Sequence, residues 1–335
     1  MKPVSSLGAF LAVASLAFAA PTSNFEANKL VDPKDLVDLV EEEQLLGLAQ
    51  AIQEFAYESP ERNRFIGTPG LDKTMDLIER SLNGQFGDEF DYYDVSRDYF
   101  KYKHKGEVLK LYNVIAQTKG GDPNNVLQLG AHMDSVAAGP GINDNASGGI
   151  ALLAIAYDLA KENYTVNNAV RFSWWSAEEE GLIGSQHYVN GLSEEERQKI
   201  RLYLNFDMIA SPAGEYGIYT SELDSTGFEA PPGVEENEEF FQDYFDDTGL
   251  KWKTVQLRGN SDHWPFVKAG IPTGGLHAGK DPNYHTANDT VENINMDVFF
   301  ETTKAIAHAV GTYALSFDSL PPRDFLDNLQ PRDFL

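Results

Sequence analysis

Apolar and polar positions along the chain follow two periods, one typical of helices and the other typical of strands. Apolar residues recur at helical spacing from 33 to 57 and again from 71 to 82. Further helices are predicted at 147–160, 184–192, 235–247, 263–269 and 298–315. Apolar runs between turn residues predict strands at 111–116, 126–131, 169–175, 201–207, 217–220 and 253–257.

The order of these elements predicts one α/β domain at 34–317. Strands that alternate with helices favour a sandwich with a largely parallel central sheet. Residues 20–33 are polar and are interpreted as a pro-segment or flexible arm, which would make the protein a zymogen. The tail at 318–335 repeats Pro-Arg-Asp-Phe-Leu and is expected to be disordered.

Residues 1–19 have the features of a secretory signal peptide. Lys2 gives a positive start, an apolar stretch follows, and Ala17-Phe18-Ala19 has the form of a cleavage site. A membrane anchor is the alternative, but the stretch is too short to span a bilayer. We therefore expect a secreted, extracellular protein.

Charge and composition narrow the possible partners. The formal net charge of -26 argues against nucleic acid and anionic membrane as partners. The chain has no cysteine, so a metal site must use His, Asp and Glu. Sequons occur at Asn145, Asn163 and Asn288. Asn163 lies in a polar loop, which makes it the best candidate for a glycan and predicts a glycoprotein.

Acidic residues and histidines follow the predicted strands. Ligands of open α/β sheets bind at the carboxyl ends of the strands, so these side chains are expected to meet at one edge. In chain order, the residues are His132, Asp134, Asp144, Glu178, Glu179, Glu180, Asp207 and His285.

A cluster of carboxylates stays ionised only if a cation lies among them. Imidazole and carboxylate ligands without thiolate suit catalytic zinc, and this many ligands favour two ions about 3.5–4 Å apart. The alternative is a scatter of surface acids on an acidic protein. Asp134 follows His132 by two residues, and it is better placed to accept the second N–H of a metal-bound histidine than to bind metal. It could also simply cap a turn.

Four stretches lie in order along the chain: GAHMDSVAAGPGINDNASG, WWSAEEEGLIGS, LNFDMI and DPNYHT. Together they resemble the secreted bacterial and fungal di-zinc aminopeptidases, the leucyl aminopeptidase-like group. The similarity runs from about residue 34 to residue 315. It implies a three-layer α/β/α sandwich with a mixed, mostly parallel central sheet.

The resemblance also implies a set of metal ligands for two Zn²⁺ per chain. His132 and Asp207 fall on the ligand positions of one ion, and Glu179 and His285 on those of the other. Asp144 falls on the position of the carboxylate that bridges both ions.

Three further roles follow from the resemblance. Glu178 falls on the general base, and Tyr284 on a residue that helps to polarise the substrate carbonyl. Asp134 falls on the carboxylate that supports the metal site, in agreement with its position after His132.

The chain departs from the family pattern in one place. Close relatives carry an arginine directly before the Ser-Asp-His element that begins here at Ser261. Asn260 takes that position, and Arg258 lies further back. The role of that arginine in shaping substrate binding is therefore open, and His263 is interpreted as a core or supporting residue.

Several remaining residues match no functional position of the family. His104, His187, His277 and His308 are interpreted as surface or structural histidines. Glu180 is interpreted as a solvated bystander or a carboxylate at a helix start.

The implied activity is removal of the N-terminal residue, hydrophobic such as leucine, from peptides with a free N-terminus. We expect a monomer. The alternatives are a related di-zinc carboxypeptidase or dipeptidase, a single-zinc glutaminyl cyclase, and a non-enzymatic receptor-like ectodomain. The last is disfavoured because no expected ligand is missing.

Overall fold

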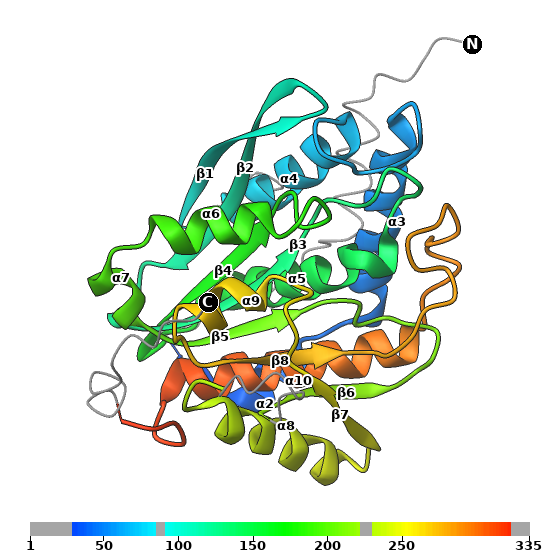
Figure 1. Ribbon diagram of the computed structural model, residues 1–335. Helices are drawn as coiled ribbons and strands as arrows, with labels where there is room; N and C mark the ends of the chain where they lie inside the picture. The colour runs from blue at the N-terminus through cyan, green and yellow to red at the C-terminus, as the bar shows by residue number, and fades with distance from the viewer. Residues whose placement is uncertain (1–28, 85–90, 222–229, 323–335) are drawn as a thin grey trace.

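The computed structural model describes residues 29–84, 91–221 and 230–322 (Figure 1). The expected signal peptide lies outside these residues, as do most of the expected arm and most of the tail. No helix within the described ranges is long and apolar enough to cross a membrane.

The described residues form an eight-stranded sheet. From edge to edge, its strands are β1 (Tyr93–His104), β2 (Glu107–Thr118), β4 (Asn168–Trp175), β3 (Asp122–His132), β5 (Ile200–Phe206), β8 (Thr273–His277), β6 (Tyr216–Thr220) and β7 (Trp252–Gln256). The pairs β3–β4, β3–β5, β5–β8 and β6–β7 are parallel. The pairs β1–β2, β2–β4 and β6–β8 are antiparallel. The predicted mixed, mostly parallel sheet is confirmed.

Helices pack on both faces of the sheet (Figure 1). The larger group consists of α2 (Pro33–Asp38), α3 (Glu42–Glu58), α4 (Pro69–Leu82), α5 (Ser147–Lys161), α8 (Val234–Thr248) and α10 (Met296–Leu315). On the opposite face lie α6 (Ile183–Gly191) and α9 (His263–Lys268), and α7 (Glu194–Lys199) leads from α6 to β5.

Neighbouring buried residues of β4 belong to the cores on opposite faces of the sheet. Successive side chains of a strand point to opposite sides, so neighbours enter different cores. Trp174 belongs to the large core beneath α5 and α10, whereas Trp175 packs with Tyr203 and Phe266 on the side of α6 and α9. Since both faces are covered, β4 is buried along its whole length.

Two predicted boundaries need correction. The helical segment expected at 33–57 is divided, because α2 ends at Asp38 and α3 begins at Glu42. The strand expected at 126–131 begins earlier, because β3 already starts at Asp122. The side chain of Asp32 begins α2 by accepting hydrogen bonds from the N–H groups of Lys34 and Asp35.

Strands β1 and β8 were not predicted. β1 is an edge strand of mostly half-exposed polar residues, so it lacks an apolar run. β8 contains Gly274 and Gly275, which weaken the strand signal. A side chain at Gly275 would lie 1.9 Å from the carbonyl oxygen of Asn205, so glycine allows β8 to approach β5.

The described domain extends slightly beyond 34–317 at both ends. Leu30 forms a parallel bridge with Thr165, and Val31 is buried. At the other end, Leu320 is buried and Arg201 donates a hydrogen bond to the carbonyl of Pro321.

We predict that Gly130→Ala destabilises the fold by about 1–3 kcal/mol through overpacking. A Cβ at Gly130 would lie 2.3 Å from the hydroxyl of Tyr203 and 2.4 Å from Nε1 of Trp175, which are hydrogen-bonded to each other. Urea unfolding measures the change. Gly120→Ala is the control, because its Cβ would meet nothing within 4 Å. Equal stability of the two variants would contradict the prediction.

Candidate metal centre

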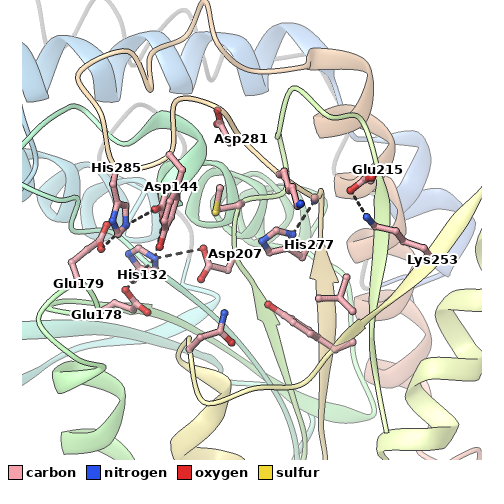
Figure 2. Close-up of a pocket in the computed structure, with 17 residues that line it drawn as sticks. His132, Asp144, Glu178, Glu179, Asp207, Glu215, Lys253, His277, Asp281 and His285 are labelled. Carbon is pink, nitrogen blue, oxygen red and sulfur yellow. Dashed lines mark hydrogen bonds and ion pairs between the residues drawn. The ribbon is translucent and has the colours of Figure 1, made fainter. Parts of the chain in front are cut away.

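The carboxyl ends of three central strands place the predicted site residues around one pocket (Figure 2). His132 is the last residue of β3, and Asp207 directly follows β5. Glu178 and Glu179 lie in the loop after β4. The two other predicted ligands come from the turn before α5 and from the loop after β8; they are Asp144 and His285.

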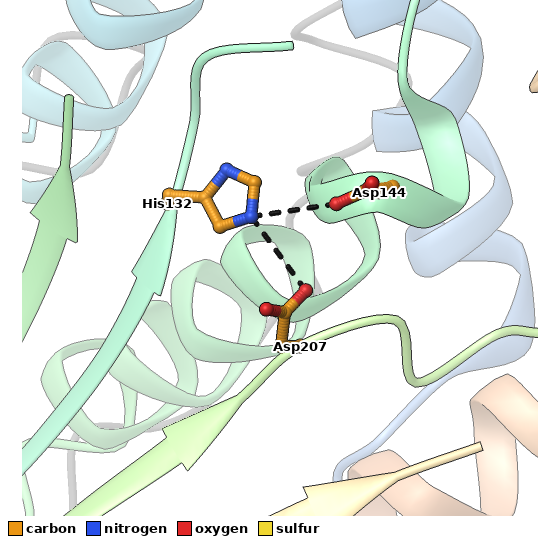
Figure 3. A group of neighbouring side chains, drawn as sticks. All are labelled: His132, Asp144 and Asp207. Atoms are coloured by element: carbon orange, nitrogen blue, oxygen red, sulfur yellow. Dashed lines mark ion pairs between the residues drawn. The ribbon is translucent and has the colours of Figure 1, made fainter. Parts of the chain in front are cut away.

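Two groups of possible ligand atoms share Asp144, and within each group the atoms lie within 4.8 Å of one another. In the first group, Nε2 of His132 lies 3.4 Å from Oδ1 of Asp144 and 3.6 Å from Oδ1 of Asp207 (Figure 3). In the second, Nε2 of His285 lies 3.1 Å from Oδ2 of Asp144 and 3.0 Å from Oε2 of Glu179. The structure thus brings the predicted ligands together in two groups that share Asp144.

Three oxygens of these groups are suited to binding a cation. Asp144 Oδ2, Glu179 Oε1 and Asp207 Oδ1 are buried and have no hydrogen-bond partner among the described residues. Buried carboxylate oxygens are costly unless they are paired or bind metal. With two imidazoles and no thiolate, the donor set suits zinc.

The electrostatic field at both histidines favours positive charge. Burial lowers the pKa of His132, but the neighbouring carboxylates of Glu178 and Asp207 outweigh it and raise that pKa well above its usual value. The neighbouring carboxylates of Asp144 and Glu179 raise the pKa of His285 to about 10. A metal ion held by each group would satisfy the same field.

Glu178 lies beside the first group but belongs to neither. Its Oε2 is 3.7 Å from Nε2 of His132, and burial raises the pKa of its carboxyl well above the usual range. Because Glu179 belongs to the second group, the two adjacent glutamates have different surroundings, as predicted.

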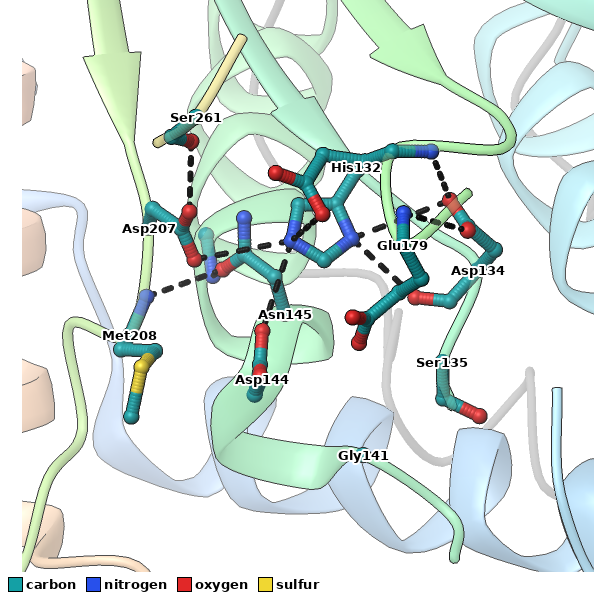
Figure 4. Close-up of polar contacts among 12 residues, drawn as sticks. His132, Asp134, Ser135, Gly141, Asp144, Asn145, Glu179, Asp207, Met208 and Ser261 are labelled. Atoms are coloured by element: carbon teal, nitrogen blue, oxygen red, sulfur yellow. Dashed lines mark hydrogen bonds and ion pairs between the residues drawn. The ribbon is translucent and has the colours of Figure 1, made fainter. Parts of the chain in front are cut away.

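Asp134 supports the site differently from the expectation. Nδ1 of His132 contacts the main-chain carbonyl oxygen of Asp134 at 3.1 Å, whereas the carboxylate is 3.8 Å away. The carboxylate instead accepts a hydrogen bond from the N–H of Glu178 at 3.1 Å. It also accepts one from the N–H of Glu179 at 3.2 Å (Figure 4). Asp134 therefore orients the histidine through its backbone and holds the glutamate loop through its side chain.

Arg64 is a buried cation behind the site that sequence reasoning missed. Its guanidinium donates hydrogen bonds to the carbonyls of Met133, Pro140 and Gly141, which lie at the two ends of the single loop that connects His132 to the turn of Asp144. Burial lowers the pKa of Arg64 to about 10, so it remains charged at neutral pH. Nothing in the sequence around Arg64 indicates this role.

Glu180 is not the bystander that the sequence suggested. Its Oε2 accepts a hydrogen bond from the hydroxyl of Tyr102 at 3.0 Å and lies 2.8 Å from Nδ1 of His104. Both partners are on β1, which the sequence did not predict. Glu180 thus connects the loop of Glu178 and Glu179 to the hairpin of β1 and β2.

The pocket has a volume of about 460 Å³. Met208, Tyr219 and Val255 line it together with the two groups of possible metal ligands. Tyr284 is 50% exposed and stacks on the ring of His285, with ring centroids 3.7 Å apart.

The pocket also contains residues to which the sequence assigned no function. His277, interpreted as a surface or structural residue, lies in its wall, and Glu215 forms an ion pair there with Lys253 (Figure 2). Asn260 lines the pocket. Arg258 is exposed, donates to Gln256 and is not among the residues that line the pocket.

His263 and Asn145 are structural in this fold. His263 is buried, its Nε2 contacts the carbonyl of Arg258, and burial lowers its pKa to about 4. Asn145 is buried and donates a hydrogen bond to the carbonyl of Phe206, so its sequon is not accessible to glycosylation.

The chain belongs to peptidase family M28, because the profile of that family matches residues 113–310. It is similar to leucine aminopeptidase 2 of Trichophyton rubrum, with 46% identity over 232 residues that cover 63% of this chain and 46% of the relative. It is also similar to aminopeptidase Y of Saccharomyces cerevisiae, with 44% identity over 237 residues, or 68% and 43% of the two chains. The match thus spans less than half the length of these relatives.

Solved structures share the fold. An aminopeptidase from Aneurinibacillus sp. strain AM-1 has a TM-score of 0.69 at 18% identity, over 87% of this chain and 97% of that one. The zinc aminopeptidase BSAP from Bacillus subtilis has a TM-score of 0.53 at 27% identity, over 64% and 51%. A glutaminyl cyclase from Porphyromonas gingivalis has a TM-score of 0.65 at 20% identity, over 83% and 98%. The fold alone therefore does not separate peptidase from cyclase.

We predict that Glu180→Ala loosens the glutamate loop. The variant loses two half-buried contacts of a charged acceptor, which are worth about 1.5–3 kcal/mol each at most. Hydrogen exchange should accelerate at the amides of 178–182 and of the β1–β2 hairpin. Glu54→Ala, on the exposed side of α3, is the control. Unchanged exchange at 178–182 would show that the contacts of Glu180 do not hold the loop.

Proposed function

We propose that this chain is a di-zinc aminopeptidase that removes hydrophobic N-terminal residues, such as leucine, from peptides. The observation that carries the proposal is the pair of ligand groups joined through Asp144, with Glu178 beside them and outside both. His132, Asp144 and Asp207 would hold one ion, and Asp144, Glu179 and His285 the other. When bound, zinc supplies Lewis-acid chemistry, making a water molecule more acidic and stabilising negative charge on the scissile carbonyl.

Glu178 is assigned the proton transfers. It accepts a proton from the attacking water and delivers it to the leaving amine, so one carboxyl serves both steps. Burial raises the pKa of this carboxyl, which favours its holding the proton between the two transfers. Asp134 accepts a hydrogen bond from the N–H of Glu178 and so keeps the carboxyl of Glu178 in the pocket.

The remaining residues of the pocket are assigned to the substrate. Tyr284 lies exposed beside His285, where its hydroxyl can donate a hydrogen bond to the carbonyl of the first residue. Met208, Tyr219 and Val255 offer an apolar wall to the first side chain. The acidic groups around the pocket favour a free, positively charged α-amino group, which accounts for an exopeptidase.

Export belongs to the same proposal. The signal-like segment at 1–19 supports secretion, and the arm at 20–33 is proposed as the pro-segment of a zymogen. We propose that the protein acts as a monomer. Asn163 and Asn288 are exposed, so both sequons are open to glycosylation.

Two alternative activities give different outcomes in simple assays. A glutaminyl cyclase needs one zinc ion. If the second ligand group also binds zinc and the activity requires that ion, the peptidase is favoured. A carboxypeptidase still cleaves a peptide whose N-terminus is acetylated, whereas the proposed aminopeptidase does not.

We predict that Glu178→Ala lowers kcat by at least about 10²-fold, because the proton acceptor is lost. Zinc content, measured by atomic absorption, should stay close to wild type, since Glu178 belongs to neither ligand group. Retention of activity in a zinc-loaded variant would show that another group is the base.

We also predict that dialysis against a chelator abolishes cleavage of a leucyl peptide and that added Zn²⁺ restores it. Without a cation, the buried oxygens of Asp144, Glu179 and Asp207 remain uncompensated, so the melting temperature should fall as well. Calorimetry and a peptide assay on the same samples measure both effects. Activity that resists exhaustive chelation would refute the metal assignment.

A further inference from the structure

A second buried carboxylate holds the main chain of a predicted metal ligand. Oδ1 of Asp289 accepts a hydrogen bond from the N–H of Asn143 at 2.8 Å, and Oδ2 accepts one from the N–H of Asp144 at 3.0 Å. Asp289 is 1% exposed. This arrangement matches that of Asp134, whose two oxygens accept the N–H groups of Glu178 and Glu179.

The turn that carries Asp144 depends on acceptors from outside. Asp144 and Asn145 have non-helical backbone angles, so the turn at Ile142–Ala146 interrupts the entry into α5. Asp289 supplies acceptors to three successive N–H groups, because its main-chain carbonyl also accepts from Ile142 at 3.2 Å. Without Asp289, these buried donors would be unpaired, which the interior penalises.

Asp289 lies in the same loop as His285, only four residues later. Asp281, at the start of that loop, accepts hydrogen bonds from the side chains of Asn143 (2.8 Å) and Asn293 (2.7 Å). The loop of His285 is therefore joined to the turn of Asp144 by several buried hydrogen bonds. The second ligand group takes Asp144 from the turn and His285 from the loop.

We propose that Asp289 is a positioning residue that sets Asp144 and His285 at the separation needed to bind the second metal ion. The inference rests on the proposed function, because it presupposes that the second group holds zinc. The first group takes its other two ligands, His132 and Asp207, from the ends of β3 and β5. Asp289 instead forms hydrogen bonds with the turn of Asp144 and with Thr286 in the loop of His285. Its loss should therefore weaken the second zinc more than the first.

Asp289→Asn tests this role with little change of volume. The amide keeps one acceptor oxygen but presents an NH₂ group to the other N–H, so one hydrogen bond is lost. Replacing a residue that orients a metal ligand typically costs about 10–100-fold in metal affinity. We expect a loss of that size for the second zinc and a smaller loss for the first.

The measurement is a zinc titration of metal-free protein against a chromophoric chelator, with the full chain made in a host that does not glycosylate. Asn288→Gln, at the exposed neighbouring position, is the matched control and should bind both ions like the wild type. Asp289→Glu keeps two carboxylate oxygens at a shifted position, so it should weaken the second zinc less than Asp289→Asn does.

The outcomes are distinguishable. If the wild type binds no zinc, the proposed function fails. If the wild type binds two ions and Asp289→Asn retains both affinities, only the present inference fails. If Asp289→Asn loses zinc affinity equally at both sites and its metal-free form has a lower melting temperature, Asp289 has a merely structural role. That result would overturn the present inference. If Asp289→Asn does not fold, an unchanged second affinity in Asp289→Glu overturns it instead.

Discussion

The buried guanidinium of Arg64 is the interaction on which the site depends. Carboxylates gathered at one sheet edge repel each other, and burial increases that cost. Arg64 places a permanent positive charge behind Asp134, Asp144 and Asp289, and the attraction of these groups opposes the loss of its own hydration. Its hydrogen bonds also hold together the two ends of the loop that connects β3 to the turn before α5. One side chain thus supplies charge compensation and fixes the loop that separates His132 from Asp144.

Main-chain hydrogen bonds to buried carboxylates then determine where the ligands point. Asp134 holds the loop after β4, and Asp289 holds the turn before α5. Ligand side chains need such support because a loop has no ladder of its own to fix its N–H groups. The three consecutive glutamates show the result: Glu178 faces the pocket, Glu179 joins a ligand group, and Glu180 binds the edge strand β1.

The same fold also serves another chemistry, since a glutaminyl cyclase shares it. A function is therefore argued from the site and not from the architecture. The proposed peptidase activity rests on two ligand groups that share Asp144 and on apolar side chains in the same pocket. The proposal that this pocket accepts the end of a peptide is supported by the exposed Tyr284 and by a volume large enough for a side chain.

The sequence by itself determined most strands and helices, the mixed α/β fold, and the residues that could bind metal. Periodicity and strand-end chemistry are local properties, so they can be read from neighbouring residues. Only the tertiary structure decided the roles of Arg64, Glu180 and Asp289 and the use of the Asp134 carboxylate. Asp289 lies 146 residues from Asn143, and Glu180 lies 76 from His104. Such contacts form when the chain folds, and they leave no periodic signal in either segment.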